Sequence, residues 1–260
     1  MKIILSKQTL VKEILISNLK KICSKFKLSS FDQNLFELEN DDRFIEQLNI
    51  KVNSNNHFKK RYFNSVYDFS VYRNLIYILV RLTKPNFVVE TGVLHGLTSA
   101  WILKALSDNK KGHLVSIDIK RSDWKKFFKK KKMGPGFEHD LNFPKDEKPG
   151  WIIPDYLKKR WKLVYGPSNK KLKLINNKID FFIHDSDHSY QNVEFEINTI
   201  LRKNINSWIV IDNYDFNSFS FDFLTKNFVK KKNFIYSIVD EVDDQLLIEE
   251  SAILLKKIIQ

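Results

Sequence analysis

Carboxylates follow two of the apolar runs in the second half of the sequence. Asp185 comes directly after the run DFFIH, and Asp212 and Asn213 end the run WIVIDN. If these runs are neighbouring parallel strands, Asp185 and Asp212 lie at adjacent strand tips, roughly 5 Å apart in the pairing direction. Carboxylate and amide oxygens at this spacing repel one another unless a cation lies between them. Hard oxygen ligands select Mg²⁺, Mn²⁺ or Ca²⁺, so the pattern predicts a divalent metal site.

His188 lies three residues after Asp185 and adds a group that can move a proton. An imidazole with a pKa near ~6.5 can take the proton of a hydroxyl that a bound cation has acidified. His184 alternates to the other side of the strand, so we expect it to be packed inside the protein. The alternative interpretation is structural: these acids face solvent or cap helices, with Asp187 or Ser189 capping the helix that follows.

A second candidate site is the glycine-bearing turn VETGVLHGLTS (89–99), which joins an apolar run to a helical segment. Glycines let a ligand approach the backbone, where N–H groups at the start of a helix face it. The spacing Gly92-x-x-x-Gly96 lacks the middle glycine of a dinucleotide fingerprint, so no pyrophosphate cradle is expected. Asp118 ends the next apolar run, and its carboxylate can accept hydrogen bonds from two ribose hydroxyls. Turn and acid together predict a ligand that contains adenosine without a pyrophosphate; the alternative is a tight structural turn beside an exposed aspartate.

The elements around these residues alternate between strands and helices. Apolar runs predict strands at 87–90, 114–118, 161–165, 179–183 and 208–212. Helical spacing predicts helices at 98–106, 190–201 and 219–229, and residues 234–239 and 246–255 can close the sheet as a hairpin. Short apolar runs separated by helices are typical of a parallel sheet covered on both faces. In such α/β sheets, ligands bind beyond the carboxyl ends of the strands.

Two segments lie outside this alternation. Residues 1–66 are predicted to form a helical and irregular N-terminal extension that begins with a helix at 5–26, whereas residues 67–260 form the α/β domain and begin with a helix at 67–82. Residues 119–156 are a long charged excursion within the domain. All seven glycines and all six prolines lie between residues 85 and 167. We expect this excursion to act as a lid-like insertion over the ligand.

The composition excludes several classes of protein. With 43% hydrophobic residues in 260, the chain can build a sizeable core and is not globally disordered. The single cysteine, Cys23, excludes a disulfide framework and a cysteine-based zinc site. No apolar run approaches the ~20 residues that span a bilayer, and the first apolar stretch is too short for a signal peptide, so we expect a cytoplasmic protein. Although the net charge is +13, residues 240–250 are acidic, and we do not expect a nucleic-acid partner.

From about Tyr67 onward, the sequence resembles class I S-adenosylmethionine-dependent methyltransferases, of the branch called methyltransferase family 24. The segments that carry the resemblance are VVETGVLHGLTSAWILKAL, LVSID, PGWIIPDYLKKRWKLVYG, DFFIHDSDHSY and IVIDN. The resemblance implies a Rossmann-like, doubly wound sheet of seven strands, mostly parallel with one antiparallel strand. We expect contacts to S-adenosylmethionine from the following residues: Glu90, Thr91, Gly92, Gly96, Thr98, Ser99, Asp118, Ser168 and Asp185.

The resemblance also extends to metal-dependent O-methyltransferases. Their pattern of an Asp after the fourth strand and Asp-Asn after the fifth maps onto Asp185, Asp212 and Asn213 as ligands of Mg²⁺, or of Mn²⁺ or Ca²⁺. The base of the catechol enzymes falls on His188. Relatives often have Gly-Asp-Ser after the third strand, where this chain has Gly-Pro-Ser (166–168). Adenine recognition is therefore expected to differ, with Trp151 or another residue of the excursion stacking on the ring.

Together these expectations describe an O-methyltransferase that acts on a hydroxyl of a sugar or another small polyol. Asp185 and His188 are its predicted catalytic residues: the cation lowers the pKa of the hydroxyl, and His188 removes the proton. The alternative is an inactive methyltransferase-fold binding protein in a glycan or surface-polymer pathway, for which Pro167 is the best support. A nucleic-acid methyltransferase fits less well, because HDSDHSY is not the Asn/Asp-Pro-Pro-aromatic motif of base methylation. Association into a homo-oligomer stays open.

Overall fold

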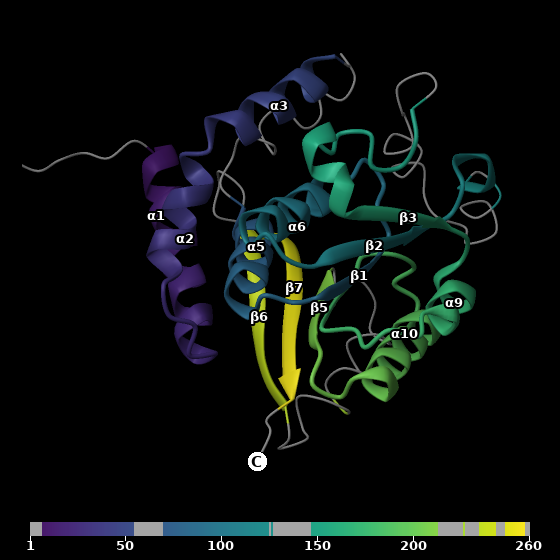
Figure 1. Ribbon diagram of the computed structural model, residues 1–260. Helices are drawn as coiled ribbons and strands as arrows, with labels where there is room; N and C mark the ends of the chain where they lie inside the picture. The colour runs from purple at the N-terminus through teal and green to yellow at the C-terminus, as the bar shows by residue number, and fades with distance from the viewer. Residues whose placement is uncertain are drawn as a thin grey trace, which may run out of the picture.

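Figure 1 presents the computed structural model, which describes residues 7–54, 70–124, 126, 147–212, 226, 234–242 and 248–257. The described α-helices are α1 (Lys7–Lys25), α2 (Phe31–Glu39), α3 (Asp42–Asn53), α5 (Val71–Thr83), α6 (Leu97–Asp108), α9 (Ser168–Lys171) and α10 (Tyr190–Lys203). Two short 3₁₀ helices are η1 (Asp155–Arg160) and η2 (Leu172–Leu174). The strands are β1 (Phe87–Thr91), β2 (His113–Asp118), β3 (Trp161–Tyr165), β4 (Phe181–His184), β5 (Trp208–Asp212), β6 (Phe234–Val242) and β7 (Ile248–Lys257).

The described strands form one seven-stranded sheet in the order β3-β2-β1-β4-β5-β7-β6. Strands β1 to β5 pair in parallel, and β7 runs antiparallel to both of its neighbours, β5 and β6. This arrangement confirms the doubly wound, Rossmann-like sheet with one antiparallel strand, and the hairpin at its end. The predicted helix at 219–229 lies, apart from Lys226, outside the described residues.

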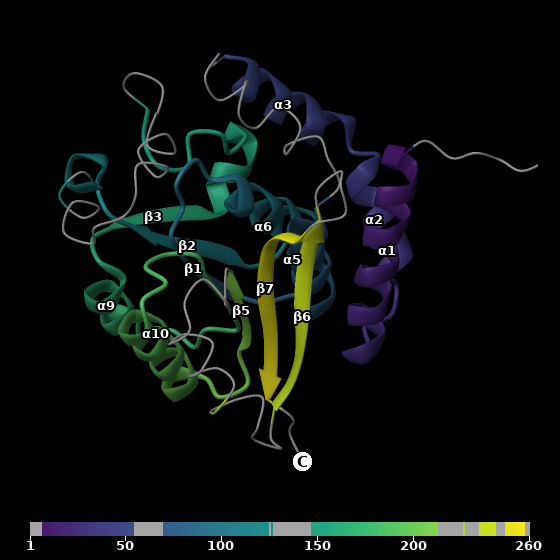
Figure 2. The ribbon, with the colours of Figure 1, turned by 180° about the vertical axis from the view of Figure 1, so that it is seen from behind.

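Helices cover both faces of the sheet, as Figures 1 and 2 show from opposite sides. In the described part of the chain, the buried apolar side chains form two clusters. Alternation along β1 divides its residues between them: Val88 joins the cluster with α5 and α6, and Val89 joins the cluster with α10. The continuous apolar runs of the sequence are explained by this burial on both faces.

Local sequence explains where several helices begin and end. The Ser70 side chain accepts a hydrogen bond from the N–H of Arg73 (3.0 Å) and caps α5. Helix α5 stops at Lys84, which adopts a left-handed conformation (φ 46°) directly before Pro85. The predicted helices at 5–26, 67–82, 98–106 and 190–201 are confirmed over their described residues; residues 5–6 and 67–69 lie outside the described part of the chain.

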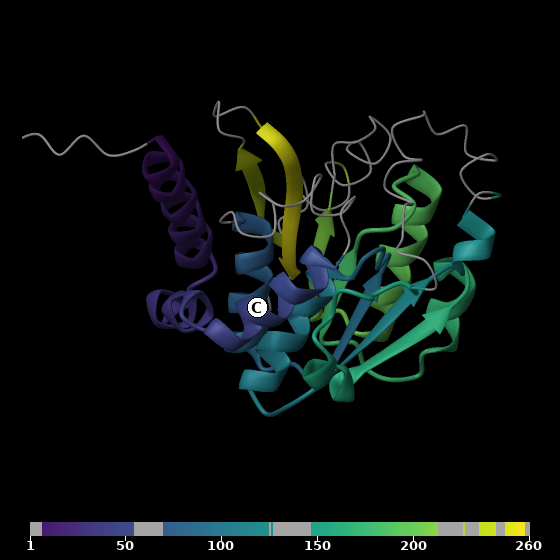
Figure 3. The same cartoon turned by 90° about the horizontal axis from the view of Figure 1, so that it is seen from above.

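The N-terminal helices pack against the sheet domain. Figure 3, seen from above, shows α1 and α2 at the end of the molecule that carries β6 and β7. Leu19, Phe44 and Val52 are buried in the same cluster as Leu75 of α5. Among the described helices, none combines the length and apolar character needed to cross a membrane.

Candidate active site

The turn between β1 and α6 has two glycines that the backbone geometry requires. Gly92 has φ 82°, and a Cβ there would lie 1.6 Å from the carbonyl oxygen of Asp185, at the end of β4. Gly96 has φ 90°, and its Cβ would lie 2.6 Å from the Cα of Gly150. Both positions combine a left-handed conformation with close backbone contact, which only glycine accommodates without strain. The turn is thus pressed against the end of β4, next to the predicted metal ligands.

Asp118 closes this turn from the end of β2. One oxygen of its carboxylate accepts hydrogen bonds from the N–H groups of Val93 and Leu94 (3.1 Å each), and the other accepts the N–H of Ile119 (2.7 Å). Burial raises the pKa of Asp118, although these hydrogen bonds and one from the Trp124 side chain oppose the rise. The carboxylate predicted to bind ribose hydroxyls therefore faces the turn that is predicted to bind the same ligand.

Glu90 and Ser99, two predicted cofactor residues, bind each other inside the protein. The Glu90 carboxylate accepts hydrogen bonds from the hydroxyls of Ser99 (2.6 Å) and Ser116 (2.7 Å), and its side chain is almost fully buried. Burial raises the pKa of Glu90 to about 7, against the effect of both hydroxyls. These side chains fix the position of the turn on β1 and β2. Thr98 is half-buried on the first turn of α6.

Asp185 and Asp212 lie at the carboxyl ends of neighbouring strands, as the sequence predicted. The register pairs His184 of β4 with Ile211 of β5, so that the two aspartates follow at the next position of each strand. Together with His188 they form a cluster in which one ligand atom from each side chain lies within 4.8 Å of the others. The predicted third ligand, Asn213, lies outside the described residues.

This donor set fits a divalent cation. Two carboxylates supply hard oxygen ligands and two negative charges, and the imidazole supplies a nitrogen that Mn²⁺, Fe²⁺ or Zn²⁺ also accepts. The acids are not helix caps of α10, whose N-cap residue is Ser189. Asp187 accepts the backbone N–H of Ser189 (3.1 Å), and Ser189 is the N-cap residue but makes no capping hydrogen bond with its side chain, so the alternative of helix capping by these side chains is not supported.

His188 is held as a neutral ring in this cluster. Its pKa is lowered to about 3, mainly by burial and also by the neighbouring His184, while the charges of Asp187 and Glu196 act in the opposite direction. Its ring also makes a hydrogen bond with the backbone carbonyl of Asp212. The His184 ring packs edge-on against it, with centroids 5.1 Å apart.

Glu196 is a buried residue of the site that the sequence did not reveal. It lies on α10 with no exposed surface, and its carboxylate is 2.7 Å from Nδ1 of the equally buried His184. It also accepts hydrogen bonds from Thr91 (2.8 Å), Ser186 (3.1 Å) and Asn192 (3.0 Å). The expectation that His184 is packed inside is confirmed. The hydroxyl of Thr91, a predicted cofactor residue, donates into this network.

Ser168 and Trp151 are the remaining residues that the sequence predicted to contact the cofactor. Ser168, half-buried at the start of α9, donates to the side-chain oxygen of Asn192 (3.2 Å). Trp151, the candidate for adenine stacking, is 3% exposed, and its indole N–H donates to Nδ1 of His95 (2.8 Å). The N–H of Gly150 also donates to the Leu94 carbonyl (2.9 Å), so this end of the excursion is fastened to the glycine turn.

Both candidate sites lie in one recognised segment. Residues 89–214 match the model of a protein family described as a methyltransferase domain, family 24. This segment of the chain is similar to a methyltransferase domain of this family. The segment contains the glycine turn, Asp118 and the Asp185–Asp212 pair, and so confirms the resemblance drawn from the sequence. Among curated proteins, none matches the chain.

Solved structures share the fold of this methyltransferase domain. An O-methyltransferase from Bacillus cereus in complex with SAH is 16% identical with a TM-score of 0.53, covering 84% of this chain and 92% of its own. A second structure is the O-methyltransferase TomG from Streptomyces achromogenes, involved in tomaymycin synthesis, in complex with SAM. It is 14% identical with a TM-score of 0.53, and the match covers 82% of this chain and 90% of TomG. The SAH-bound methyltransferase PaMTH1 from Podospora anserina is 14% identical with a TM-score of 0.50, and the match covers 84% of this chain and 88% of PaMTH1. At these low sequence identities, the structural similarity is evidence for the fold alone.

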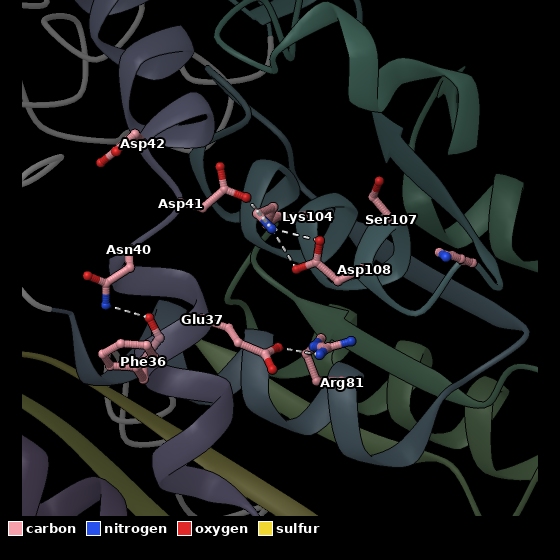
Figure 4. A pocket seen from close by; sticks show the side chains of 10 residues that line it. Phe36, Glu37, Asn40, Asp41, Asp42, Arg81, Lys104, Ser107 and Asp108 are labelled. Atoms are coloured by element: carbon pink, nitrogen blue, oxygen red, sulfur yellow. Dashed lines mark hydrogen bonds and ion pairs between the residues drawn. The ribbon is translucent and has the colours of Figure 1, made fainter.

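A pocket of about 600 Å³ lies at the opposite edge of the methyltransferase sheet, next to the amino ends of β1 and β2 (Figure 4). Five of its charged side chains form ion pairs with one another. Lys104, almost fully buried, contacts Asp41 (2.7 Å) and Asp108 (2.6 Å), and Arg81 contacts Glu37 (2.6 Å). The ion pairs join the N-terminal helices to α5 and α6. We assign this pocket to the packing of those helices, because the groups suited to methyl transfer lie at the other edge.

Proposed function

We propose that the chain is an S-adenosylmethionine-dependent O-methyltransferase that uses a divalent cation and methylates a hydroxyl of a sugar or another small polyol. The methyltransferase domain supports the transfer reaction, and the O-methyltransferases solved with SAH or SAM support the cofactor and an oxygen acceptor. The observation that carries the proposal is the close approach of Gly92 to the carbonyl oxygen of Asp185. Because the glycine turn and the candidate cation ligands meet there, a cofactor on the turn and a hydroxyl at the cation are close enough to react.

Asp118 is the proposed anchor of the cofactor ribose. The carboxylate of Asp118 has about four lone-pair sites, and the N–H groups of Val93, Leu94 and Ile119 and the Trp124 side chain use them, so a ribose hydroxyl would take the place of one of these donors. Ser168 and Thr98 are proposed to make further contacts, since both are half-buried, Thr98 on the first turn of α6 and Ser168 at the start of α9 after β3. Gly92 and Gly96 let the turn pack against Asp185 and Gly150, which sets the position of the backbone groups proposed to face the ligand.

Glu90, Thr91 and Ser99 are proposed to act on the cofactor through the position of the turn. Their side chains are buried and take part in hydrogen bonds within the protein. A change in any of them would move the backbone of β1 or α6, and with it the groups that face the ligand.

Asp185 and Asp212 are proposed to hold the cation. A divalent cation bound there supplies a Lewis acid that lowers the pKa of a hydroxyl. The two carboxylates fix the position of that hydroxyl relative to the glycine turn. His188 has a ring nitrogen near both carboxylates, so it either accepts the proton of the hydroxyl, as the sequence predicted, or binds the cation directly. A polyol suits such a site because two adjacent hydroxyl oxygens can reach one cation.

Transfer of a radiolabelled methyl group from S-adenosylmethionine to a panel of sugars and polyols tests the proposal. We expect labelling of at least one acceptor, its loss with a chelator, and recovery with Mg²⁺ or Mn²⁺. Asp185→Asn and Asp212→Asn should reduce the rate, whereas Asp123→Asn, at an exposed position, is the matched control.

Two results would count against the proposal. Full activity of Asp185→Asn in the presence of a chelator would show that the reaction needs no cation at this site. Failure to bind S-adenosylmethionine at millimolar concentration would favour the alternative, a methyltransferase-fold protein that binds a glycan without catalysis. Pro167, which stands where relatives often have an acid, is the residue that motivates this alternative.

A further inference from the structure

We infer that His188 is a direct ligand of the cation, the third with Asp185 and Asp212, and not the general base. The inference rests on the proposed function, because it concerns the same site. It changes the expected metal, and it means that His188 does not remove the proton of the hydroxyl.

The spacing of the three side chains suits one ion. A ligand nitrogen of His188 and a carboxylate oxygen from each aspartate lie within 4.8 Å of one another. Ligands about 2.1 Å from an octahedral cation are about 3 Å apart when adjacent and about 4 Å apart when opposite. Shifts of a few tenths of an ångström to about an ångström would therefore complete the site without moving the strands.

The orientation of the His188 ring also suits a ligand. One ring nitrogen donates a hydrogen bond to the backbone carbonyl of Asp212. In a neutral imidazole the other nitrogen then carries a lone pair, as a metal ligand requires. Metal-bound histidines usually make this kind of second hydrogen bond, which fixes the tautomer and the direction of the ring. Here the acceptor belongs to the residue whose carboxylate supplies another ligand.

The surroundings hold this ring in place before any cation binds. His184 packs edge-on against His188, with an angle of 79° between the rings and centroids 5.1 Å apart. His184 is itself fixed by Glu196, whose carboxylate lies 2.7 Å from its Nδ1. A ring held by packing and by a backbone hydrogen bond is preorganised for binding, so less rotational freedom is lost when the ion arrives.

A nitrogen ligand changes the expected metal. Mg²⁺ and Ca²⁺ prefer sites made of oxygen alone, whereas Mn²⁺ and other first-row ions accept imidazole beside carboxylates. We therefore expect this chain to bind Mn²⁺ more tightly than Mg²⁺. A nitrogen that binds the cation cannot accept a proton with the same lone pair, so the proton of the cation-acidified hydroxyl passes to solvent water.

Pulsed electron paramagnetic resonance of the full chain loaded with Mn²⁺ tests the inference without measuring activity. We expect hyperfine coupling to a directly bound ¹⁴N in the unmodified protein, and its loss in His188→Ala. The Mn²⁺ dissociation constant should rise by about tenfold or more in that variant, since even the outer-shell partners of a ligand are worth ~10–100-fold in metal affinity. His113→Asn, an exposed histidine at the start of β2, is the control and should leave both measurements unchanged.

The outcomes separate this inference from the proposed function. Mn²⁺ that binds with no nitrogen coupling in the unmodified protein overturns the ligand role of His188 and leaves the cation-dependent reaction standing. Binding of neither Mn²⁺ nor Mg²⁺ overturns the inference together with the cation part of the proposed function. The spectrum of the unmodified protein decides the question even if His188→Ala does not fold.

Discussion

The imidazole of His184 and the carboxylate of Glu196 form a fully buried pair beside the candidate cation site, with Nδ1 2.7 Å from Oε2. Glu196 also accepts hydrogen bonds from Thr91 of β1 and from Asn192 of its own helix. One carboxylate therefore joins β1, β4 and α10 at the edge of the sheet where methyl transfer is proposed. Its removal would leave several buried polar groups without their acceptor.

Glu196→Ala should lower the free energy of unfolding by about 3–5 kcal/mol, the usual cost of removing one partner of a buried pair. Urea denaturation followed by circular dichroism measures the change. Glu194→Ala, on the same helix and partly exposed, is the control, and we expect a loss below about 1 kcal/mol there. Equal losses in the two variants would show that the buried network adds no stability.

The carboxylate of Glu196 should also make the free energy of unfolding depend on pH in the acidic range. Burial alone would raise the pKa of Glu196, but the charge of His184 and the hydrogen bonds to the carboxylate outweigh it and hold the pKa below its ordinary value. A carboxyl group with a depressed pKa stabilises the fold above its unfolded pKa, and this contribution is lost as the pH falls through the folded value. The difference in unfolding free energy between the unmodified protein and Glu196→Gln should therefore shrink below about pH 4. A difference that stays constant from pH 7 to pH 3 would exclude an ionised Glu196.

Glu90 should have the opposite effect, because burial raises its pKa to about 7. A carboxyl group whose pKa is raised by folding contributes its full stabilisation below its pKa in the unfolded chain. This stabilisation is lost as the pH rises through the pKa of the folded protein. Relative to the unmodified protein, Glu90→Gln should gain stability between about pH 4.5 and pH 7, by about 3 kcal/mol in total, and no more above that range. Denaturation midpoints at closely spaced pH values test this. Parallel pH profiles for the two proteins would mean that Glu90 titrates normally.

Gly92→Ala should disrupt both the fold and the site. The new Cβ would meet the carbonyl of Asp185 at a left-handed residue, and we expect a loss of more than about 2 kcal/mol together with weaker cofactor binding. Gly166→Ala is the matched comparison: it also has a positive φ (136°), but its Cβ would meet the flexible side chain of Lys171. Thermal unfolding and cofactor titration of both variants measure the difference. A Gly92→Ala protein with unchanged cofactor affinity would place the cofactor away from this turn.

Much of this arrangement follows from local sequence. The strands were predictable because each is a short apolar run buried on both faces, and the proximity of Asp185 to Asp212 follows from the parallel register of β4 and β5. Glu196 was not predictable, since a glutamate on a polar helix ordinarily faces solvent, and its burial depends on where α10 docks. The link between Trp151 and His95 likewise joins residues 56 positions apart and leaves no local pattern.

Isothermal titration calorimetry of the full chain with S-adenosylmethionine addresses the core of the proposal. We expect saturable binding with one site per chain and an affinity in the micromolar range. Asp118→Asn should weaken it by about tenfold, through the loss of a charged acceptor for ribose hydroxyls, while Asp123→Asn should match the unmodified protein. The absence of binding heat at millimolar S-adenosylmethionine, in a protein whose circular dichroism confirms the fold, would rule out a methyltransferase that uses this cofactor.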